Sequence, residues 1–401
     1  MPKIRGEIVI EFISYIIYAV KKNRFFNFSI NIILGVISKP FRYKLPNEIY
    51  DLDNLAVKPN INSKFVNYKS LDNKSIEESI HVILAGKNHK LYCDNLWNIL
   101  STDLEEELSL HRFGWLLIRE AKKENLLHDN FGIFCIIDWI SKNQSLEGQG
   151  WDSYSISERV SNWIIYLNNN KFKINDNQYG YIKISIEIQL QELLNNLELR
   201  GGSTNNHIIN NGRALYLGGL YFDIKEFIIP GKKILIDSLE FMFSSSGFLR
   251  EGSSHYQILL ARTYIEVLWF SSEYNDFNFE SILKNKVKNI WHASCFFLEE
   301  EEMPIFGDIS PDYPIGFHNG VALVGERIWD EESDALLPNK AGWHSFFINT
   351  KYLKRDKKKK EGLINYQDSG YCRFRNNIFT IYIYTNPSGY VPSWSHGHSD
   401  T

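Results

Sequence analysis

The chain has 401 residues, of which 44% are hydrophobic, so it can form a sizeable core and is not a disordered polypeptide. Its formal net charge of −4 provides no basic field, and we therefore expect no nucleic-acid partner. The four cysteines lie far apart without a C-x-x-C pair, which gives no indication of a thiol metal site or a disulfide framework.

The first 75 residues are predicted to form an N-terminal extension. Residues 7–20 are apolar, but this stretch is short and contains Glu7 and Glu11. It has no small-residue cleavage site, so we expect an amphipathic helix packed on the protein, and neither a signal peptide nor a stable membrane span. A cytoplasmic location is therefore favoured, with a periplasmic one as the alternative.

Helical periodicity dominates the chain from there to about residue 300. The predicted helices are separated by short polar loops and cover residues 94–100, 104–122, 129–141, 157–168, 182–199, 204–222, 233–243, 254–270 and 281–298. Repeated helical hairpins without convincing strands indicate a mainly α domain over residues 1–300, arranged as a bundle, a solenoid or a toroid.

Residues 301–401 have a different character and are predicted to be a linker followed by the start of a β-domain. Residues 354–360 are almost all basic and are expected to form a solvated loop. Segments 370–375 and 378–384 are rich in β-branched and aromatic residues, which predicts a strand pair joined at residues 376 and 377. Because the chain ends at Thr401, we expect too few strands to close a sandwich.

The first candidate site is Asn205-Asn206-His207, which follows Ser203 and Thr204. Either of the last two residues can cap the helix that comes next. Backbone N–H groups at a helix start are unpaired, and the helix dipole favours negative charge there, so an amide and an imidazole at this place suit a carboxylate ligand. The alternative is that the asparagines only cap the helix and His207 is an ordinary polar residue.

Two further stretches contain side chains that suit a glycan. Trp151 and Tyr154 precede a helix that Ser157 is expected to cap, and their rings suit either stacking on a sugar or packing in the core. Tyr256 lies in the first turn of another predicted helix, where we expect its phenol to point toward the same end of the molecule as His207.

The last candidate is a histidine pair near the C-terminus. If this stretch is a strand, His396 and His398 lie on one face, since side chains two residues apart do so. Two imidazoles can share a metal, or one can bind a metal while the other acts on substrate.

Taken in order, these stretches resemble the heparinase II/III-type polysaccharide lyases. That family has an asparagine–histidine pair at the start of one helix, a D-G-x-x-x-E-x-S-x-x-Y run entering the next long helix, and an H-x-H-x-D motif where a β-sandwich begins. The matching residues here are Asn206 and His207; Gly247, Glu251, Ser253 and Tyr256; and His396, His398 and Asp400. The chain departs from the pattern at Ser246, where the family usually has aspartate.

The resemblance covers residues 85–401 and implies an incomplete α/α toroid followed by the start of an antiparallel β-sandwich. It implies β-elimination on an acidic, uronate-containing polysaccharide, with Asn206 and His207 neutralising the uronate carboxylate. Tyr256 and His396 would act as acid and base, in an order that the stereochemistry of the sugar decides. Substrate contacts are expected from Trp151, Tyr154, Glu158, Arg159, Asn205, Glu251 and His255.

No cofactor is implied for this chemistry. The resemblance implies a structural zinc, with His398 as a ligand, only for a complete sandwich. Because the sandwich is cut off, we expect weak turnover or none from this chain.

Two other functions stay open on the sequence. An (α/α) glycoside hydrolase needs two carboxylates that flank the scissile bond, and Asp152, Glu158, Glu251 and Asp308 are available without a motif that pairs them. A non-catalytic glycan-binding protein is consistent with the short β-domain. The oligomeric state is not defined by the sequence.

Overall fold

The computed structural model describes residues 79–122 except 93, 98 and 100, residues 131–199, 204–349 and 361–385, and Lys64. Within these residues the protein is mainly helical, with ten α-helices and two small antiparallel sheets. The helices are α3 (Leu104–Arg112), α4 (Gly114–Ala121), α5 (Phe131–Lys142), α6 (Ser153–Asn169), α7 (Asp176–Asn195), α8 (His207–Phe222), α9 (Lys225–Met242), α10 (Ser254–Glu273), α11 (Phe277–Phe297) and α12 (Val321–Trp329). The helices predicted in the N-terminal extension, the basic run 354–360 and the histidine pair near the C-terminus lie outside the described residues.

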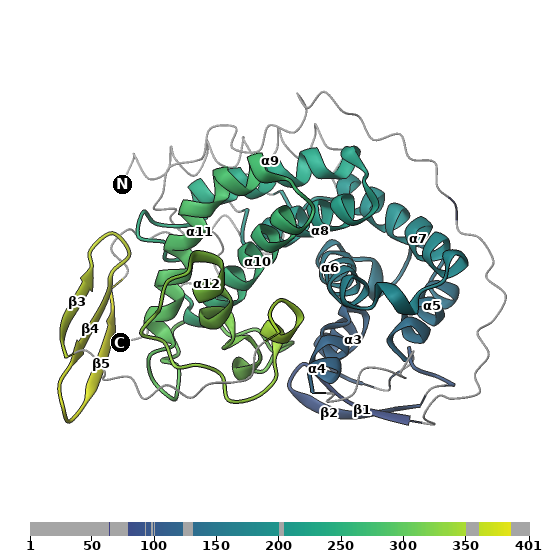
Figure 1. The fold of residues 1–401 in the computed structure, drawn as a ribbon. Helices are drawn as coiled ribbons and strands as arrows, with labels where there is room; N and C mark the ends of the chain where they lie inside the picture. The colour runs from purple at the N-terminus through teal and green to yellow at the C-terminus, as the bar shows by residue number, and fades with distance from the viewer. Residues whose placement is uncertain are drawn as a thin grey trace, which may run out of the picture.

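The helices follow one another in a curved arrangement, with α6, α8 and α10 on the inner side and α7, α9 and α11 on the outer side (Figure 1). Helix α8 packs against α6 and α9, and α10 packs against α11. Glycines allow the close contact between α8 and α9. A Cβ on Gly231 would lie 2.7 Å from the backbone nitrogen of Tyr216, and one on Gly212 would lie 2.7 Å from a methyl carbon of Ile234.

Three predictions for the first half of the chain were wrong. Residues 79–92 form a hairpin, with strands β1 (Ser79–Leu84) and β2 (Lys87–Tyr92), whereas no strand was expected before residue 300. The helix expected over 94–100 is absent, because the described residues of that segment form turns and irregular structure. The helix expected over 104–122 is divided into α3 and α4, since Phe113 adopts a left-handed backbone conformation with φ of 61°.

Further helices also differ from the prediction, among them α7, which was expected over 182–199. Helix α9 begins at Lys225 instead of residue 233, and Pro230 lies inside it. Its contact with α8 offsets the one helical hydrogen bond that proline cannot donate. Helix α12 was not expected, and it packs against α10 and α11.

The second sheet has the order β3-β4-β5, and both pairs are antiparallel. The predicted strand pair is confirmed as β4 (Tyr371–Arg375) and β5 (Thr380–Tyr384), and β3 (Gly362–Tyr366) adds an unexpected strand. Arg373 and Arg375 lie on the buried face of β4, and both contact the carboxylate of Glu299, which follows α11. These ion pairs attach the sheet to the helical part of the protein.

A second attachment comes from the turn between β3 and β4. Asp368 accepts hydrogen bonds from the hydroxyl of Ser245 at 2.7 Å, and from the backbone N–H and hydroxyl of Ser246 at 2.9 and 2.7 Å. Although partial burial opposes it, these hydrogen bonds lower the pKa of Asp368. In its carboxylate form, Asp368 thus holds the β3–β4 turn against the loop between α9 and α10.

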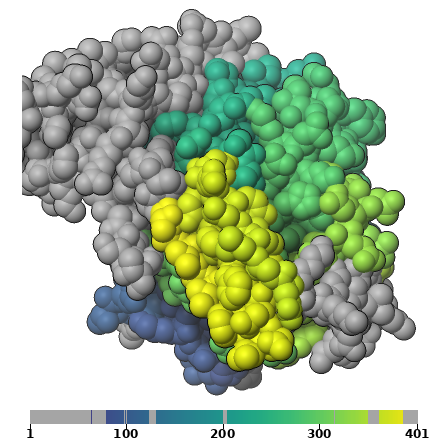
Figure 2. Space-filling view, turned by 90° about the vertical axis from the view of Figure 1, so that its left-hand side faces the viewer, coloured from purple at the N-terminus to yellow at the C-terminus, as the bar shows by residue number. Residues whose placement is uncertain are grey.

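The opposite face of this sheet is apolar and lies on the outside of the molecule (Figure 2). Leu363, Phe374 and Ile381 form one cross-strand row, and their side chains are 66%, 40% and 46% exposed. Only the face toward the helices is buried, so the sheet contributes to the core from one side.

Candidate functional site

The start of α8 is the centre of the candidate site. The helix begins at His207, and the residue at its N-cap is Asn206 instead of the predicted Ser203 or Thr204. Ser203 lies outside the described residues, and Thr204 is buried. The capping hydrogen bond comes from Asn205, whose Oδ1 accepts the backbone N–H of His207 at 3.2 Å.

Although Asn206 occupies the N-cap position, its side chain makes no capping hydrogen bond and is directed to Glu251 instead. The side-chain Nδ2 of Asn206 donates to Oε2 of Glu251 at 2.8 Å, and its backbone N–H donates to Oε1 at 3.1 Å. Glu251 lies in the loop that leads into α10. This two-bond contact connects the start of α8 to the segment that carries Tyr256.

His207 lies between a carboxylate and an aromatic ring. Its Nδ1 is 2.9 Å from Oε1 of Glu198, and 39% of its side chain is exposed. The ring of Tyr154, from the first turn of α6, is 4.6 Å from the imidazole, and the guanidinium of Arg112 lies 4.9 Å from the centre of the Tyr154 ring. The starts of α6 and α8 are thus joined through side chains.

Tyr256 lies in the first turn of α10, as predicted, and Ser253 caps this helix by accepting the backbone N–H of Tyr256 at 2.9 Å. Burial, together with the negative charges of Asp308 and Glu251, raises the pKa of the Tyr256 phenol to about 12. The Tyr256 phenol also lies close enough to Tyr154 to contribute to raising the pKa of the Tyr154 phenol. At neutral pH Tyr256 is therefore protonated and is suited to donate a proton.

His255, which precedes Tyr256, is buried and faces the interior. Its Nδ1 accepts the backbone N–H of Ser310 at 2.9 Å, so it helps to fix the segment that follows α11 against the start of α10. Burial, together with the charge of Arg262, lowers the pKa of His255 to about 4. The ring is neutral at pH 7 and holds this segment, and direct contact with a substrate would require the segment to move.

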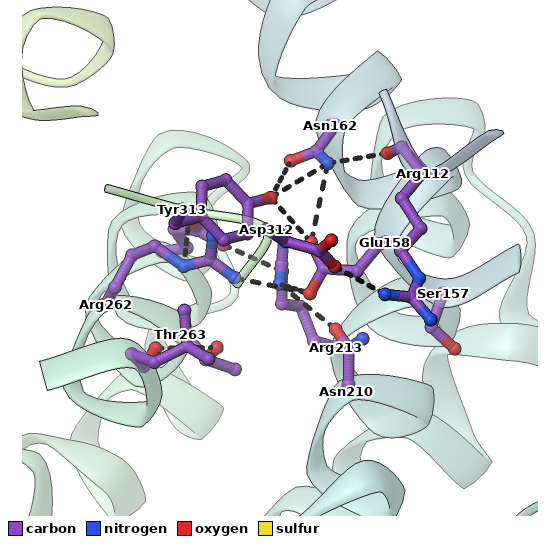
Figure 3. Close-up of polar contacts among 12 residues, drawn as sticks. Arg112, Ser157, Glu158, Asn162, Asn210, Arg213, Arg262, Thr263, Asp312 and Tyr313 are labelled. Carbon is purple, nitrogen blue, oxygen red and sulfur yellow. Dashed lines mark hydrogen bonds and ion pairs between the residues drawn. The ribbon is translucent and has the colours of Figure 1, made fainter. Parts of the chain in front are cut away.

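Glu158 is the centre of a buried ionic network that underlies the site (Figure 3). Its carboxylate is 3.2 Å from Arg213 and 3.5 Å from Arg262, and it accepts the hydroxyl of Tyr313 at 2.8 Å. Burial alone would raise the pKa of Glu158, but the two arginines outweigh it and lower the value to about 2. The side chain is 1% exposed, so it joins α6, α8 and α10 from inside.

The same network includes Arg112, which reaches the aromatic contact beside His207. Arg112 pairs with Asp312 at 2.5 Å and with Glu105 at 3.0 Å, and it donates a long hydrogen bond of 3.4 Å to Ser155. Tyr313 and Asp312 are neighbours in the chain, so one segment after α11 contacts both Glu158 and Arg112.

Arg159 and Trp151 pack inside the helical part of the protein. Nε of Arg159 donates to Gln189 at 2.7 Å, another of its nitrogens donates to the carbonyl of Gly150 at 2.7 Å, and the guanidinium lies 3.9 Å from the ring centre of Trp139. Trp151 is 8% exposed. Both side chains are therefore placed to support the site from the interior.

The helix that carries Glu158 and Arg159 also starts earlier than predicted. Asp152 is the N-cap of α6 and accepts the backbone N–H of Ser155 at 3.0 Å, whereas Ser157 was expected to have this role. Ser157 is instead buried within the helix. The shift brings Tyr154 into the first turn.

The sequence-based analysis did not identify Glu198, Arg112, Asp312, Tyr313, Arg213 or Arg262. None of them belongs to a motif with a fixed spacing to the predicted residues, and Arg112 and Asp312 are separated by 200 positions. The only available signal was the number of arginines and acidic residues inside helices that are otherwise apolar, which indicates buried ion pairs without identifying the partners.

The histidine pair and its implied zinc are not tested by the structure, because His396 and His398 lie outside the described residues. Among the residues that are described, no group of three histidine, cysteine, aspartate or glutamate side chains is arranged to hold a metal ion. The described helices also include none that is long and apolar enough to cross a membrane.

Comparisons with models of protein families, with curated proteins and with solved structures gave no significant match to this chain.

Proposed function

We propose that the protein is a polysaccharide lyase that cleaves an acidic, uronate-containing glycan by β-elimination, as its resemblance to the heparinase II/III-type lyases implies. In this proposal the curved helical part is an incomplete α/α toroid and β3–β5 begin an antiparallel β-sandwich. The observation that carries it is the linkage of Tyr154, Asn206, His207, Glu251 and Tyr256 across the starts of α6, α8 and α10.

The chemistry needs three functions that these residues can supply. A base removes the proton next to the uronate carboxylate, donors neutralise that carboxylate as it gains enolate character, and an acid protonates the leaving glycosidic oxygen. With its pKa raised to about 12, the Tyr256 phenol is protonated at neutral pH and carries a proton that the leaving oxygen could accept. His207 and Asn206 are the candidate donors, and the resemblance implies His396 as the partner of Tyr256 in acid–base transfer, in an order that the stereochemistry of the sugar decides.

Ser246 is the position at which the chain departs from the family pattern. Asp368 contacts its hydroxyl and its backbone N–H, so the sheet turn supplies a carboxylate in this loop. This contact supports a structural role for the aspartate that the family has at the position of Ser246, a role that Asp368 would take here. The departure therefore does not argue against the proposed family.

A glycoside hydrolase is the second candidate, and one observation favours it. Asp308 and Glu251 both lie near enough to Tyr256 to raise the pKa of its phenol. Glycosidic hydrolysis requires two carboxylates that flank the scissile bond. The negative charges of Asp308 and Glu251 would also repel an anionic substrate. If the protein is a lyase, the carboxylate of the sugar must therefore lie on the side of His207 and Arg112.

The products of cleavage distinguish the two reactions. Elimination leaves an unsaturated sugar that absorbs in the ultraviolet, and hydrolysis produces reducing ends without this absorbance. The assay uses uronate-containing polysaccharides with the unaltered chain, with Tyr256→Phe and with Tyr179→Phe as a control that removes a hydroxyl from the distant helix α7. New reducing ends without ultraviolet absorbance would show that the protein is a hydrolase and not a lyase. Binding without cleavage would indicate a glycan-binding protein.

A further inference from the structure

The side chain that controls His207 is Glu198, which precedes α8 and belongs to none of the motifs discussed above. Its Oε1 lies 2.9 Å from Nδ1 of His207, within the range of a good hydrogen bond. A carboxylate only accepts, so the imidazole must carry its proton on Nδ1 for this contact to be favourable. Nε2 is then the ring nitrogen left to bind a ligand.

Glu198 is itself held firmly by Asn211, one turn further along α8. The backbone N–H of Glu198 donates to Oδ1 of Asn211 at 2.9 Å, and Nδ2 of Asn211 donates to Oε2 of Glu198 at 3.1 Å. Asn211 is fully buried and also donates to the hydroxyl of Ser157 at 3.0 Å. Asn211 and His207 therefore bond to different oxygens of the Glu198 carboxylate.

The orientation of the imidazole is fixed by a second contact. The ring of Tyr154 lies 4.6 Å from it, with an angle of 46° between the planes, and Arg112 lies over the Tyr154 ring. A histidine with Nδ1 bonded and one face covered has little freedom to rotate. Since 39% of the side chain is exposed, the remaining nitrogen is accessible from solvent.

We infer that Glu198 is a positioning residue that keeps a proton of His207 on Nδ1, so that Nε2 accepts a hydrogen bond in the neutral ring and donates to an anionic ligand group only when it is itself protonated. When Nε2 also binds a proton, the ring becomes a cation paired with Glu198, and this form donates from Nε2 to a carboxylate. Hydrogen bonds at one ring nitrogen set the chemistry of the other in many histidine sites. The identity of the ligand as a uronate carboxylate rests on the proposed function, whereas the position of the proton does not.

The test is nitrogen-15 NMR of the histidine side chains in the full chain, with the His207 signals assigned by their loss in His207→Gln. Neutral His207 is expected to carry its proton on Nδ1 in the unaltered protein. In Glu198→Gln the amide can donate to Nδ1, so the proton is expected to move to Nε2 in a substantial fraction of molecules. Glu192→Gln, at a partly exposed site on α7 whose carboxylate accepts a hydrogen bond from Asn196, serves as the control and should leave the His207 signals unchanged.

Three results decide the inference. A His207 proton on Nε2 in the unaltered protein, or signals that Glu198→Gln does not change, would overturn it. If the proton moves as expected and the protein is a lyase, Glu198→Gln should lower kcat/KM by about tenfold or more, the effect of losing one charge-assisted hydrogen bond. If the proton moves but neither form binds or cleaves a uronate-containing polysaccharide, the role of Glu198 stands and the proposed function fails.

Discussion

Replacing Glu158 by glutamine tests whether the buried ionic network holds α6, α8 and α10 together. Glutamine keeps the size of the side chain but removes the charge that faces Arg213 at 3.2 Å and Arg262 at 3.5 Å. The two guanidinium groups stay buried with less compensation, and removing one partner of such a pair costs about 3–5 kcal/mol.

The pKa of Glu158 gives an independent magnitude. It is lowered from an ordinary value of 4.5 to about 2, and each tenfold change in proton affinity is worth about 1.4 kcal/mol, so the charged form is stabilised by about 3 kcal/mol. Because the folded-state pKa is the lower one, this contribution is fully present above about pH 4.5 and is lost as the pH falls toward about 2.

The assay is equilibrium unfolding in urea at pH 7 and again at pH 3. Glu158→Gln should lower the free energy of unfolding by about 3 kcal/mol at pH 7, and by about half of that or less at pH 3, where the unfolded form of Glu158 is already protonated. Glu105→Gln is the control, because Glu105 pairs with Arg112 but is 46% exposed, and it should cost less than about 1 kcal/mol. Equal stability of Glu158→Gln and the unaltered protein at pH 7 would refute the reasoning.

Three further outcomes are expected. Asp368→Asn should lower the protection factors for amide hydrogen exchange in β3 and β4 with little change in α10. In the unaltered protein the same protection factors should fall as the pH falls and Asp368 is protonated, and equal protection factors in both proteins would show that this turn does not attach the sheet. Tyr256→Phe should abolish most of the cleavage that the unaltered chain shows, however weak, without lowering thermal stability by more than a few degrees; in the unaltered protein, ionisation of this phenol should not reduce turnover until the pH approaches 12. Trp343→Phe should cost about 1–3 kcal/mol of stability in urea unfolding, since it leaves the buried carboxylate of Glu266 without an indole donor at 2.7 Å; a change near zero would mean that another donor replaces it.

The sequence by itself determined those features that depend on neighbours along the chain. Ser253 caps α10 and places Tyr256 in the first turn, because an N-cap bond joins residues three positions apart. The strands β4 and β5 followed from their β-branched and aromatic residues and from the short connection between them. The hairpin β1–β2 was also readable, since Ile80, Val82 and Leu84 alternate with more exposed positions, but the period of two was not recognised over so short a segment.

Tertiary structure alone decided what the polar side chains of these elements do. Glu158 and Arg159 are adjacent on a helix, and both suit a substrate contact on sequence grounds. Their burial depends on helices that come later in the chain, which supply Arg213, Arg262 and Gln189 as partners. A local sequence pattern indicates which face of a helix is buried, but not which residues pack against that face. The partners in such ion pairs therefore cannot be predicted from the sequence.

The same reason explains the candidate site. Asn206 was expected to offer its amide to a ligand, and the structure gives that amide to Glu251, which is 45 positions away. His207 was recognised from its place at a helix start, whereas Glu198 was not, because it lies nine positions earlier, outside any predicted motif. Helix starts can be predicted from capping residues and periodicity. Which carboxylate contacts which donor is decided only in the folded protein, where charged groups from distant parts of the chain are buried together and must be paired.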